Sequence, residues 1–237
     1  MVEEPKRLSK AVAALVPCSR REAEQYITEG WVRVDGKVVR EPQFRVAGEP
    51  VEIDPRANLQ PALPATFLVH KPAGMGTTEA QSLLVAAMHW QGDTSGVRRL
   101  RSHAVGLAPL LALPASAGGL SVFSQDARIM RKLREDARLI EQELLAEVAG
   151  DLVAGGLSRL CEGLVHEGRA LPPARVSWQS EARLRFAVKG IAPEVVPWMC
   201  AQVGLRLTAL KRIRIGRVPM ASLPAGQWRY LAPGERF

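Results

Sequence analysis

The chain of 237 residues contains no apolar run long enough to cross a bilayer, and its opening residues, 1–6, lack the apolar core of a signal peptide. It contains only three cysteines, and Cys18, Cys161 and Cys200 lie far apart, without the paired spacing of a metal site or a disulfide framework. We therefore expect a cytoplasmic protein with reduced thiols, no bound metal and no cofactor.

Charge is missing from one long internal stretch. No Asp, Glu, Lys, Arg or His occurs between residues 104 and 125, a segment rich in Ala, Pro, Ser and Gly that leads into the β-prone run Leu120–Phe123. Small residues just before a buried strand allow other groups to approach the backbone closely. Taken alone, the stretch predicts a tight connection inside a core.

Elsewhere the chain is basic, with a formal net charge of +8. Residues 6–54 hold nine Lys/Arg against eight Asp/Glu, whereas residues 55–237 hold 23 against 14. A polyanionic partner is consistent with this excess. In the first fifty residues, however, such a partner could be contacted only through a one-sided patch.

The N-terminal segment has strong local signals. Residues 7–16 have the apolar spacing of a helix, and Ser19-Arg-Arg-Glu22 forms a capping box that opens a second helix ending at Gly30. Residues 31–40 alternate around Asp35-Gly36, a dipeptide typical of a hairpin turn. A short strand is predicted at residues 51–53.

This order of helices and hairpin resembles the S4 RNA-binding domain, on the matching features Arg7-Leu8, Cys18–Ala23, Ile27, Gly30 and Val32–Lys37. The resemblance implies that the start of the second helix faces RNA phosphates. Each basic residue by itself would be read as a solvated surface charge, but as a set they predict RNA contact. The set comprises Lys10, Arg20, Arg21 and Lys37.

Residues 55–65 hold prolines without periodicity and predict a linker. Beyond it we expect a strand from Phe67 that ends in the turn Lys71-Pro-Ala-Gly74. Further helices are predicted over 79–90, 126–138, 157–164 and 193–202, and further strands over 141–149, 174–179, 182–188 and 207–215. In the last strand, Arg212 and Arg214 are expected to share one face.

The order of these elements resembles the bacterial rRNA pseudouridine synthases that carry an N-terminal S4 domain, the small-subunit uridine synthase type. The landmarks are Lys71–Gly74, Thr77-Thr78, Val105-Gly106, Gly119-Leu120, Glu147–Gly150, Leu160–Gly163, Pro173-Ala174 and the tail from Arg212 to Arg229. The resemblance implies an α+β fold. It consists of an S4 domain over residues 1–54, the linker over 55–65, and a mixed β-sheet domain flanked by helices over 66–237.

Three motifs depart from the family pattern. Active members read Gly-Arg-Leu-Asp-x-x-(Ser/Thr)-x-Gly-Leu, in which the Asp adds covalently to the target nucleotide. Counting back from Gly119-Leu120 places Leu113-Pro114 on the Leu-Asp pair. Leu144 occupies the place of a Tyr that packs on the flipped base, and the segment 190–199, where the family has an Arg-rich run, holds no cation.

These departures predict an RNA-binding protein on a pseudouridine synthase scaffold, a monomer that binds rRNA or another structured RNA without catalysis. Its degenerate cleft would be apolar and lined by Leu113, Pro114 and Leu144. In the larger domain, the RNA contacts are predicted to come from Lys211, Arg212 and Arg214.

Two alternatives remain open. The chain could be an active synthase with a relocated nucleophile, for which Asp126 and Asp93 are the acids to consider, although Asp126 is also placed to cap the following helix. It could instead be a ribosome-associated adaptor that binds protein through Trp198 and Met199, although such a pair more often lies in a core.

Overall fold

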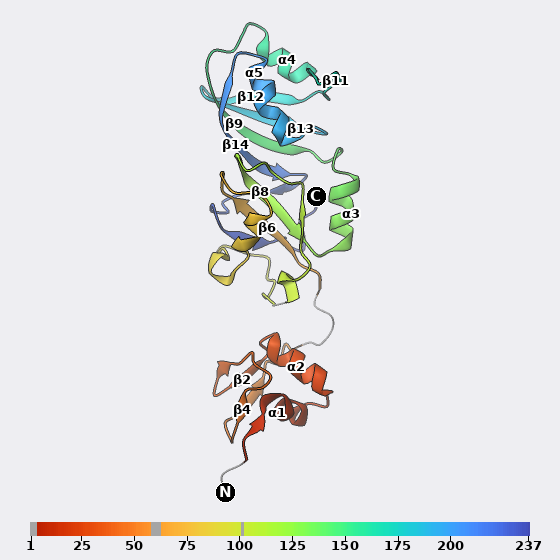
Figure 1. Cartoon of the computed structure of the whole chain (residues 1–237), viewed down its shortest axis with the longest axis vertical. Helices are drawn as coiled ribbons and strands as arrows, with labels where there is room; N and C mark the ends of the chain where they lie inside the picture. Colours follow the sequence, from red (N-terminus) through yellow and green to blue (C-terminus); the bar gives the residue numbers. More distant parts are fainter. Residues whose placement is uncertain (1–3, 58–62, 101) are drawn as a thin grey trace. The chain divides into compact units, whose positions relative to one another are not determined.

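The computed structural model of the chain describes residues 4–57, 63–100 and 102–237 (Figure 1). The chain divides into two compact units, one made of residues 1–63 and 98–105 and the other of residues 64–97 and 106–237. Residues 58–62 of the expected linker lie outside the described residues. The segment 98–105, expected in the larger domain, instead groups with the N-terminal unit.

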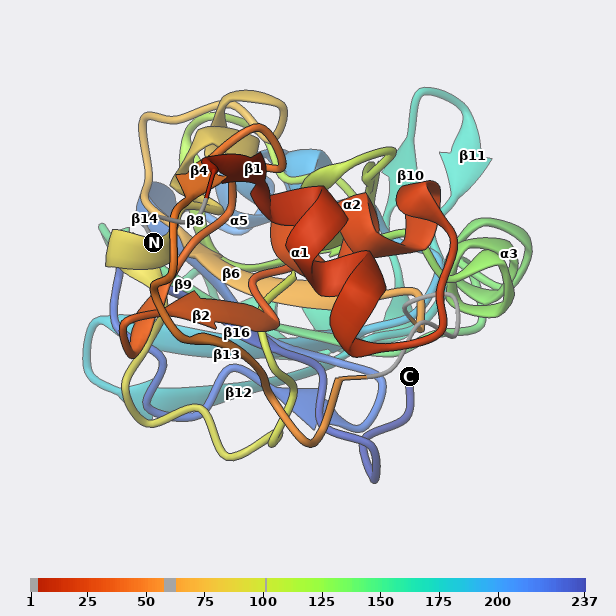
Figure 2. The same ribbon diagram turned by 90° about the horizontal axis from the view of Figure 1, so that it is seen from below.

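The smaller unit contains the predicted helices and hairpin. Helices α1 (Leu8–Leu15) and α2 (Arg20–Thr28) pack against each other (Figure 2). The capping box is confirmed, because the Ser19 amide donates to Glu22 Oε2 at 2.7 Å and the Glu22 amide donates to Ser19 Oγ at 3.3 Å. The turn is also confirmed, with positive φ at Asp35 and Gly36. The strands are β1 (Lys6–Arg7), β2 (Val32–Val34), β3 (Lys37–Val38), β4 (Arg45–Val46) and β5 (Val51–Ile53).

One contact explains why the segment 98–105 groups with this unit. The Arg98 guanidinium donates to the Gly30 carbonyl at 2.6 Å and lies over the Trp31 ring, 3.4 Å from its centroid. A cation over an indole face is attracted by the quadrupole of the ring. The segment continues into the short helix η3 (Ser102–Ala104), in which His103 is buried.

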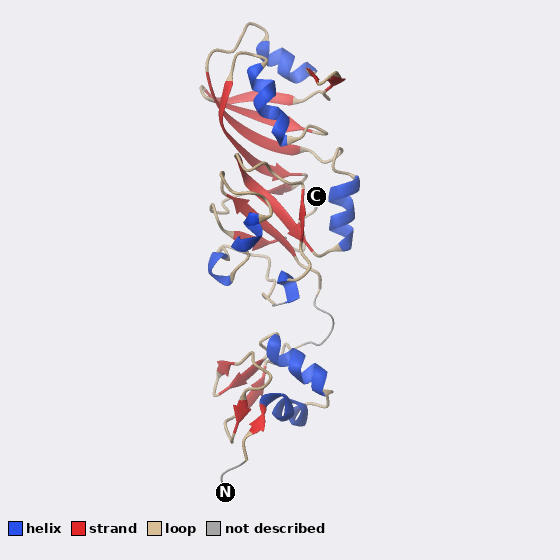
Figure 3. Ribbon diagram, in the orientation of Figure 1, coloured by secondary structure: helices blue, strands red, loops and turns tan. Residues whose placement is uncertain are grey.

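The larger unit is organised on one nine-stranded sheet in the order β12-β13-β9-β14-β8-β6-β16, with β7 on β8 and β15 on β14 (Figure 3). The pair β14 and β8 is parallel, and the other ladders of the sheet are antiparallel. The strands are β6 (Thr66–Lys71), β7 (Ala108–Leu110), β8 (Ala117–Ser124), β9 (Gln142–Ala149), β12 (Arg175–Ser180), β13 (Arg183–Val188), β14 (Arg206–Ile215), β15 (Val218–Pro219) and β16 (Trp228–Tyr230).

Helices cover parts of this sheet. Helix α3 (Ala127–Glu135) packs on β7 and β8, while α4 (Gly156–Glu162), η4 (Pro193–Val195) and α5 (Val196–Ala201) cover the half built from β9 and β12–β14. A small hairpin, β10 (Val165–His166) with β11 (Arg169–Ala170), follows α4. Every residue of β6 and β8 is buried, so both faces of the sheet are covered there. In β9, buried even-numbered residues face the helices.

The helix predicted over 79–90 does not form as a unit. The structure has two short 3₁₀ turns instead, η1 (Glu79–Leu83) and η2 (Ala86–Met88). The Trp228 indole donates to the Val85 carbonyl at 2.9 Å, and the Trp90 amide donates to the Trp228 carbonyl at 2.8 Å. The chain therefore leaves the helical path to run beside β16, a tertiary contact that overrides local helix propensity.

The prediction that Arg212 and Arg214 share a face is wrong. Against β9 the register shifts between these two residues, because Arg212 pairs with Leu144 and Arg214 pairs with Glu143. One extra residue in β14 forms a bulge and reverses the alternation of side chains. Arg212 therefore points to the helix-covered face and Arg214 to the opposite face.

Candidate nucleic-acid interface and degenerate cleft

The loop between β7 and β8 is fixed from beneath by one buried lysine. The Lys71 ammonium donates to four carbonyls, those of Met75 at 2.6 Å, Pro72 at 3.2 Å, Pro114 at 3.2 Å and Ala117 at 2.5 Å. Lys71 is fully buried, and burial, followed by the nearby Arg212, lowers the pKa of its ammonium. The landmark Lys71-Pro-Ala-Gly74 thus holds the loop in which the family carries its catalytic Asp.

Two more landmarks support the same loop. Thr77 Oγ1 accepts from the Leu113 amide at 3.0 Å and donates to the Leu113 carbonyl at 2.9 Å. Gly119 has φ +105°, and a Cβ there would lie 2.2 Å from the Arg212 carbonyl oxygen. Only glycine lets β8 approach β14 this closely.

The loop backbone is strained at Leu111, which has φ +48°. This left-handed region is uncommon for a bulky residue. Backbone strain of this kind gathers at functional sites.

Beside Leu111 opens a cavity of about 360 Å³, and one of the three departures from the family pattern, the segment 190–199, contributes to its lining. The loop contributes Leu111 and Ala112, β9 contributes Gln142 two residues before Leu144, and the segment that lost its cations contributes Gly190–Glu194. The lining residues are Leu111, Ala112, Ala137, Arg138, Gln142, Gly190, Ile191, Ala192, Pro193, Glu194 and Arg212. Residues that lie far apart in the sequence thus line one cavity.

The cavity is polar at its base. Arg212 is fully buried, its Nε donates to the Leu120 carbonyl at 2.7 Å, and its Nη1 donates to Gln142 Oε1 at 2.8 Å. Its Nη2 is buried and has no partner among the described residues. Burial lowers the pKa of Arg212 to about 9, and the Glu194 carboxylate opposes that shift. A cation without a direct ion pair therefore lies beneath the cavity.

The apolar cleft predicted from Leu113, Pro114 and Leu144 is not what the structure contains. Leu113 and Leu144 are 3% and 0% exposed and belong to the core under α4 and α5. Pro114 is partly buried, and its carbonyl faces Lys71. The cleft lies next to these residues, and its chemistry comes from Arg138, Gln142, Glu194 and Arg212, because alternation along β9 sends Gln142 to the cavity end of the core face.

Neither acid considered as a relocated nucleophile lines this cavity. Asp126 caps α3, accepting from the Arg128 amide at 2.8 Å. Asp93 contacts His89 Nε2 at 2.8 Å and accepts from the Tyr230 amide at 2.9 Å, so it is a structural residue of the larger unit. The carboxylate that does line the cavity is Glu194, in the segment 190–199 that holds no cation.

On the S4 unit, two of the predicted RNA-binding residues are brought together. Lys10 and Arg20 line a hollow of about 290 Å³ with Arg7, Ser9 and Ala13. Arg20 is exposed and pairs with Glu24 at 3.1 Å, a surface ion pair that solvent weakens. Arg21 and Lys37 are also exposed, but they do not line this hollow.

The predicted RNA contacts of β14 have different surroundings. Arg214 donates to Glu141 Oε1 and to Glu143 Oε1, each at 2.5 Å, within a ladder of ion pairs that continues to Arg175 and Arg185. Hydrogen bonds and charge from these carboxylates raise the pKa of Arg214. Lys211 is partly buried and Arg212 is fully buried. Their role in RNA contact stays a prediction.

The pair offered as a protein-binding surface lies largely inside the molecule. Met199 is fully buried, and Trp198 packs against the same core with its ring edge-on to His166, 4.5 Å between centroids.

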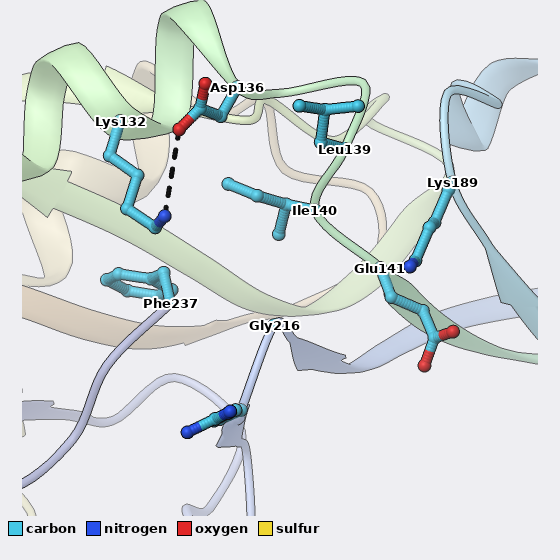
Figure 4. A pocket seen from close by; sticks show the side chains of 9 residues that line it. Lys132, Asp136, Leu139, Ile140, Glu141, Lys189, Gly216 and Phe237 are labelled. Carbon is cyan, nitrogen blue, oxygen red and sulfur yellow. Dashed lines mark ion pairs between the residues drawn. The ribbon is translucent and has the colours of Figure 1, made fainter.

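A separate hollow of about 410 Å³ lies beside α3, where Lys132 and Asp136 form an ion pair at 3.7 Å near Phe237 (Figure 4). It contains none of the predicted site residues.

Within the described ranges, no group of three or more His, Cys, Asp or Glu side chains is placed to hold a metal ion. The helices of those same ranges are too short or too polar for any of them to cross a membrane.

Comparison with known proteins agrees with this architecture. Residues 6–49 match the model of the S4 domain. Over 97% of its length the chain is 28% identical to an uncharacterized RNA pseudouridine synthase of Aquifex aeolicus, covering 94% of that protein. Over 90% of its length it is 29% identical to a chloroplastic protein of Arabidopsis thaliana named as a candidate ribosomal large subunit pseudouridine synthase, of which it spans 55%.

Among solved structures, a crystal structure of a pseudouridylate synthase superimposes with a TM-score of 0.60. The match covers 95% of this chain and 96% of that one at 19% sequence identity, a level that establishes the fold alone.

Proposed function

We propose that this chain, which joins an S4 domain to a domain with the pseudouridine synthase fold, binds rRNA or another structured RNA without isomerising uridine. One observation carries the proposal. The loop that presents the catalytic carboxylate in the family has no ionisable side chain here, and Leu113-Pro114 stands at the Leu-Asp position. Proline offers neither a nucleophile nor a titratable group.

The support for RNA binding is independent of that loop. The S4 match covers the two helices and the hairpin, and Arg7, Lys10 and Arg20 surround one hollow on that unit. Arg20 and Arg21 also stand in the first turn of α2, where backbone amides favour anions. Together they form a surface suited to phosphodiester groups.

The experiment is a binding titration of purified chain with rRNA fragments over a series of salt concentrations. Replacing both Arg20 and Arg21 by Ala should weaken binding and lower the slope of log K against log salt by about 1 unit for each lost phosphate contact. The control is Arg175→Ala with Arg183→Ala, two exposed arginines of β12 and β13 that pair with Glu141 and Glu147. Unchanged affinity and slope in the α2 variant would refute the proposal.

A second candidate function rests on Glu194. It is the one carboxylate among the described residues that line the cavity, and its charge acts on the buried Arg212. An active synthase would then use Glu194 in place of the missing Asp. Pseudouridine formation by the wild-type chain that disappears in Glu194→Gln would select this candidate, because the substitution removes the negative charge and keeps the shape.

A further inference from the structure

The cavity beside Leu111 combines charges of opposite sign. Arg212 and Arg138 supply cations, Glu194 supplies a carboxylate, and Gln142 supplies an amide whose oxygen already accepts from Arg212. A plain oxyanion would meet the Glu194 carboxylate, and a plain cation would meet the two guanidinium groups. A ligand that fits this cavity must therefore present hydrogen-bond acceptors next to hydrogen-bond donors along one polar edge.

The remaining lining is largely apolar. It includes Leu111, which has a left-handed backbone, and the buried Ile191 and Pro193. Apolar walls with a few converging polar groups are the usual construction of a small-molecule site. A volume of about 360 Å³ is enough for a planar heterocycle with its sugar.

We infer that this cavity binds a guanine base, held by Glu194 on one side of its Watson–Crick edge and by the arginines on the other. Guanine presents O6 beside N1–H and N2–H₂, an acceptor followed by two donors. A carboxylate can accept from N1–H and N2–H₂ together, and arginine is the commonest partner of guanine O6 and N7. The inference rests on the RNA-binding function proposed above and names the nucleotide that this second site recognises.

Other bases match the cavity less well. Uracil has a single N3–H between two carbonyls, so one of its acceptors would be directed toward the Glu194 carboxylate. Adenine has no carbonyl for the arginines and a single amino group for Glu194. Single-stranded RNA segments are commonly read through hydrogen bonds to the edges of splayed bases, which is how a guanine would reach this position.

The buried Arg212 leaves one donor available to a ligand in this cavity. Its Nη2 has no partner in the described residues, and a buried donor without an acceptor is costly. Gln142 fixes the orientation of the guanidinium through Nη1, and the Leu120 carbonyl fixes it through Nε. Arg212 is therefore a positioning cation beneath the base, while the exposed Arg138 and Glu194 make the edge contacts.

The test is nuclear magnetic resonance of the full chain, labelled with nitrogen-15 and titrated to millimolar concentration with guanosine, uridine and adenosine monophosphates and with inorganic phosphate. The expected result is that guanosine monophosphate shifts the resonances of residues 190–194 and 111–112, with an affinity about tenfold higher than that of uridine monophosphate. Inorganic phosphate alone should leave those resonances unchanged.

In Glu194→Gln the guanosine preference should fall to the uridine level, whereas Glu181→Gln, at the exposed turn between β12 and β13, should keep it. Equal shifts by all nucleotides, shifts outside the cavity, or no shift would overturn the inference. In each of those cases rRNA binding that depends on Arg20 and Arg21 would leave the proposed function standing. If guanosine monophosphate alone shifts these resonances but the chain does not bind rRNA, only the proposed function is refuted.

Discussion

The loop that joins β7 to β8 has two sides that differ in their likeness to the pseudouridine synthases. On the supporting side, Lys71, Thr77 and Gly119 stand at landmarks of the family pattern, and each one holds the loop or the strand that follows it. On the cavity side, Leu111 and Ala112 bring no ionisable group, and Glu194 stands in the segment where the pattern has a cationic run.

This difference shows that the departures are not a general erosion of the fold. Random substitution would change the buried Lys71 or the close-packed Gly119 as readily as the residues that line the cavity. Here the residues that fix the backbone have the family's chemistry, while those that would meet a nucleotide have a new one. The larger unit therefore presents a loop without an ionisable side chain, on which the proposed non-catalytic role rests.

The largest expected effect on stability comes from Gly119→Ala, which alters one of the residues that hold the loop and strand β8. A Cβ at this position would overlap the Arg212 carbonyl oxygen at 2.2 Å, in a backbone conformation of φ +105° that alanine rarely adopts. We expect a loss of more than about 4 kcal/mol in the free energy of unfolding, or no folded protein. Chemical denaturation measures it. Gly76→Ala, with nothing within 4 Å of the added Cβ, is the control and should fold normally.

Replacing Lys71 by Met should have the next largest effect. The substitution keeps a long side chain but removes the donor for four carbonyls, among them those of Pro114 and Ala117. We expect a cost of about 3 kcal/mol in unfolding experiments, because buried carbonyls lose their partner. Lys132→Met, which removes only a half-exposed ion pair with Asp136, should cost less than about 0.5 kcal/mol. If both variants lose the same free energy of unfolding, Lys71 does not hold the loop as described.

A smaller effect on stability is expected from pH, through two buried histidines. Burial lowers the pKa of His70, whose Nδ1 donates to the Leu223 carbonyl at 2.7 Å, and burial also lowers the pKa of His103. Both imidazoles are therefore favoured in the neutral form in the folded state. Their contribution to the free energy of unfolding is intact above the ordinary pKa of 6.5, and it is lost as pH falls through their lowered pKa values in the folded state. Thermal unfolding should show declining stability from pH 7 to pH 5.

His70→Gln should reduce that slope without removing it, because His103 still titrates. A slope identical to that of the wild type would show that His70 is protonated equally in the folded and unfolded states.

The smallest effect is expected from Pro114→Asp, in the loop next to the cavity. The Lys71 contact uses the Pro114 carbonyl, which the substitution keeps, so stability should change by less than about 1 kcal/mol. Restoring the acid should not restore activity, because Pro114 does not line the cavity and the segment 190–199 holds no cation. Pseudouridine formation by this variant would show that one residue alone separates the chain from an enzyme.

Local sequence signals predicted the S4 unit well. The capping box, the Asp35-Gly36 turn and the alternating strands depend on neighbours in sequence, and the structure has them where expected. Six strands of the large sheet were also predicted, whereas β7, β15 and β16 were not. The helix expected over 79–90 was not foreseeable as 3₁₀ turns, because Trp228, far along the chain, determines its end.

The site was harder to read for a physical reason. A bulge between Arg212 and Arg214 reverses a face, and nothing in the apolar–polar pattern of that strand marks it. The cavity joins residues from four distant segments, so counting along the loop located the missing carboxylate but not Glu194, Arg138 or Gln142. The absence of cations between residues 190 and 199 was the signal that could have drawn attention to Glu194.

The most direct test of the central claim is a map of pseudouridine in total rRNA from a strain lacking the related enzymes, after incubation with the purified chain. Chemical blocking of reverse transcription at pseudouridine gives the readout. We predict stable binding of the rRNA and no stop that depends on the protein, since no nucleophile is held at attack distance in the loop. A protein-dependent stop that survives Asp126→Ala and Asp93→Ala would contradict the account, and its loss in Glu194→Gln would identify the carboxylate responsible.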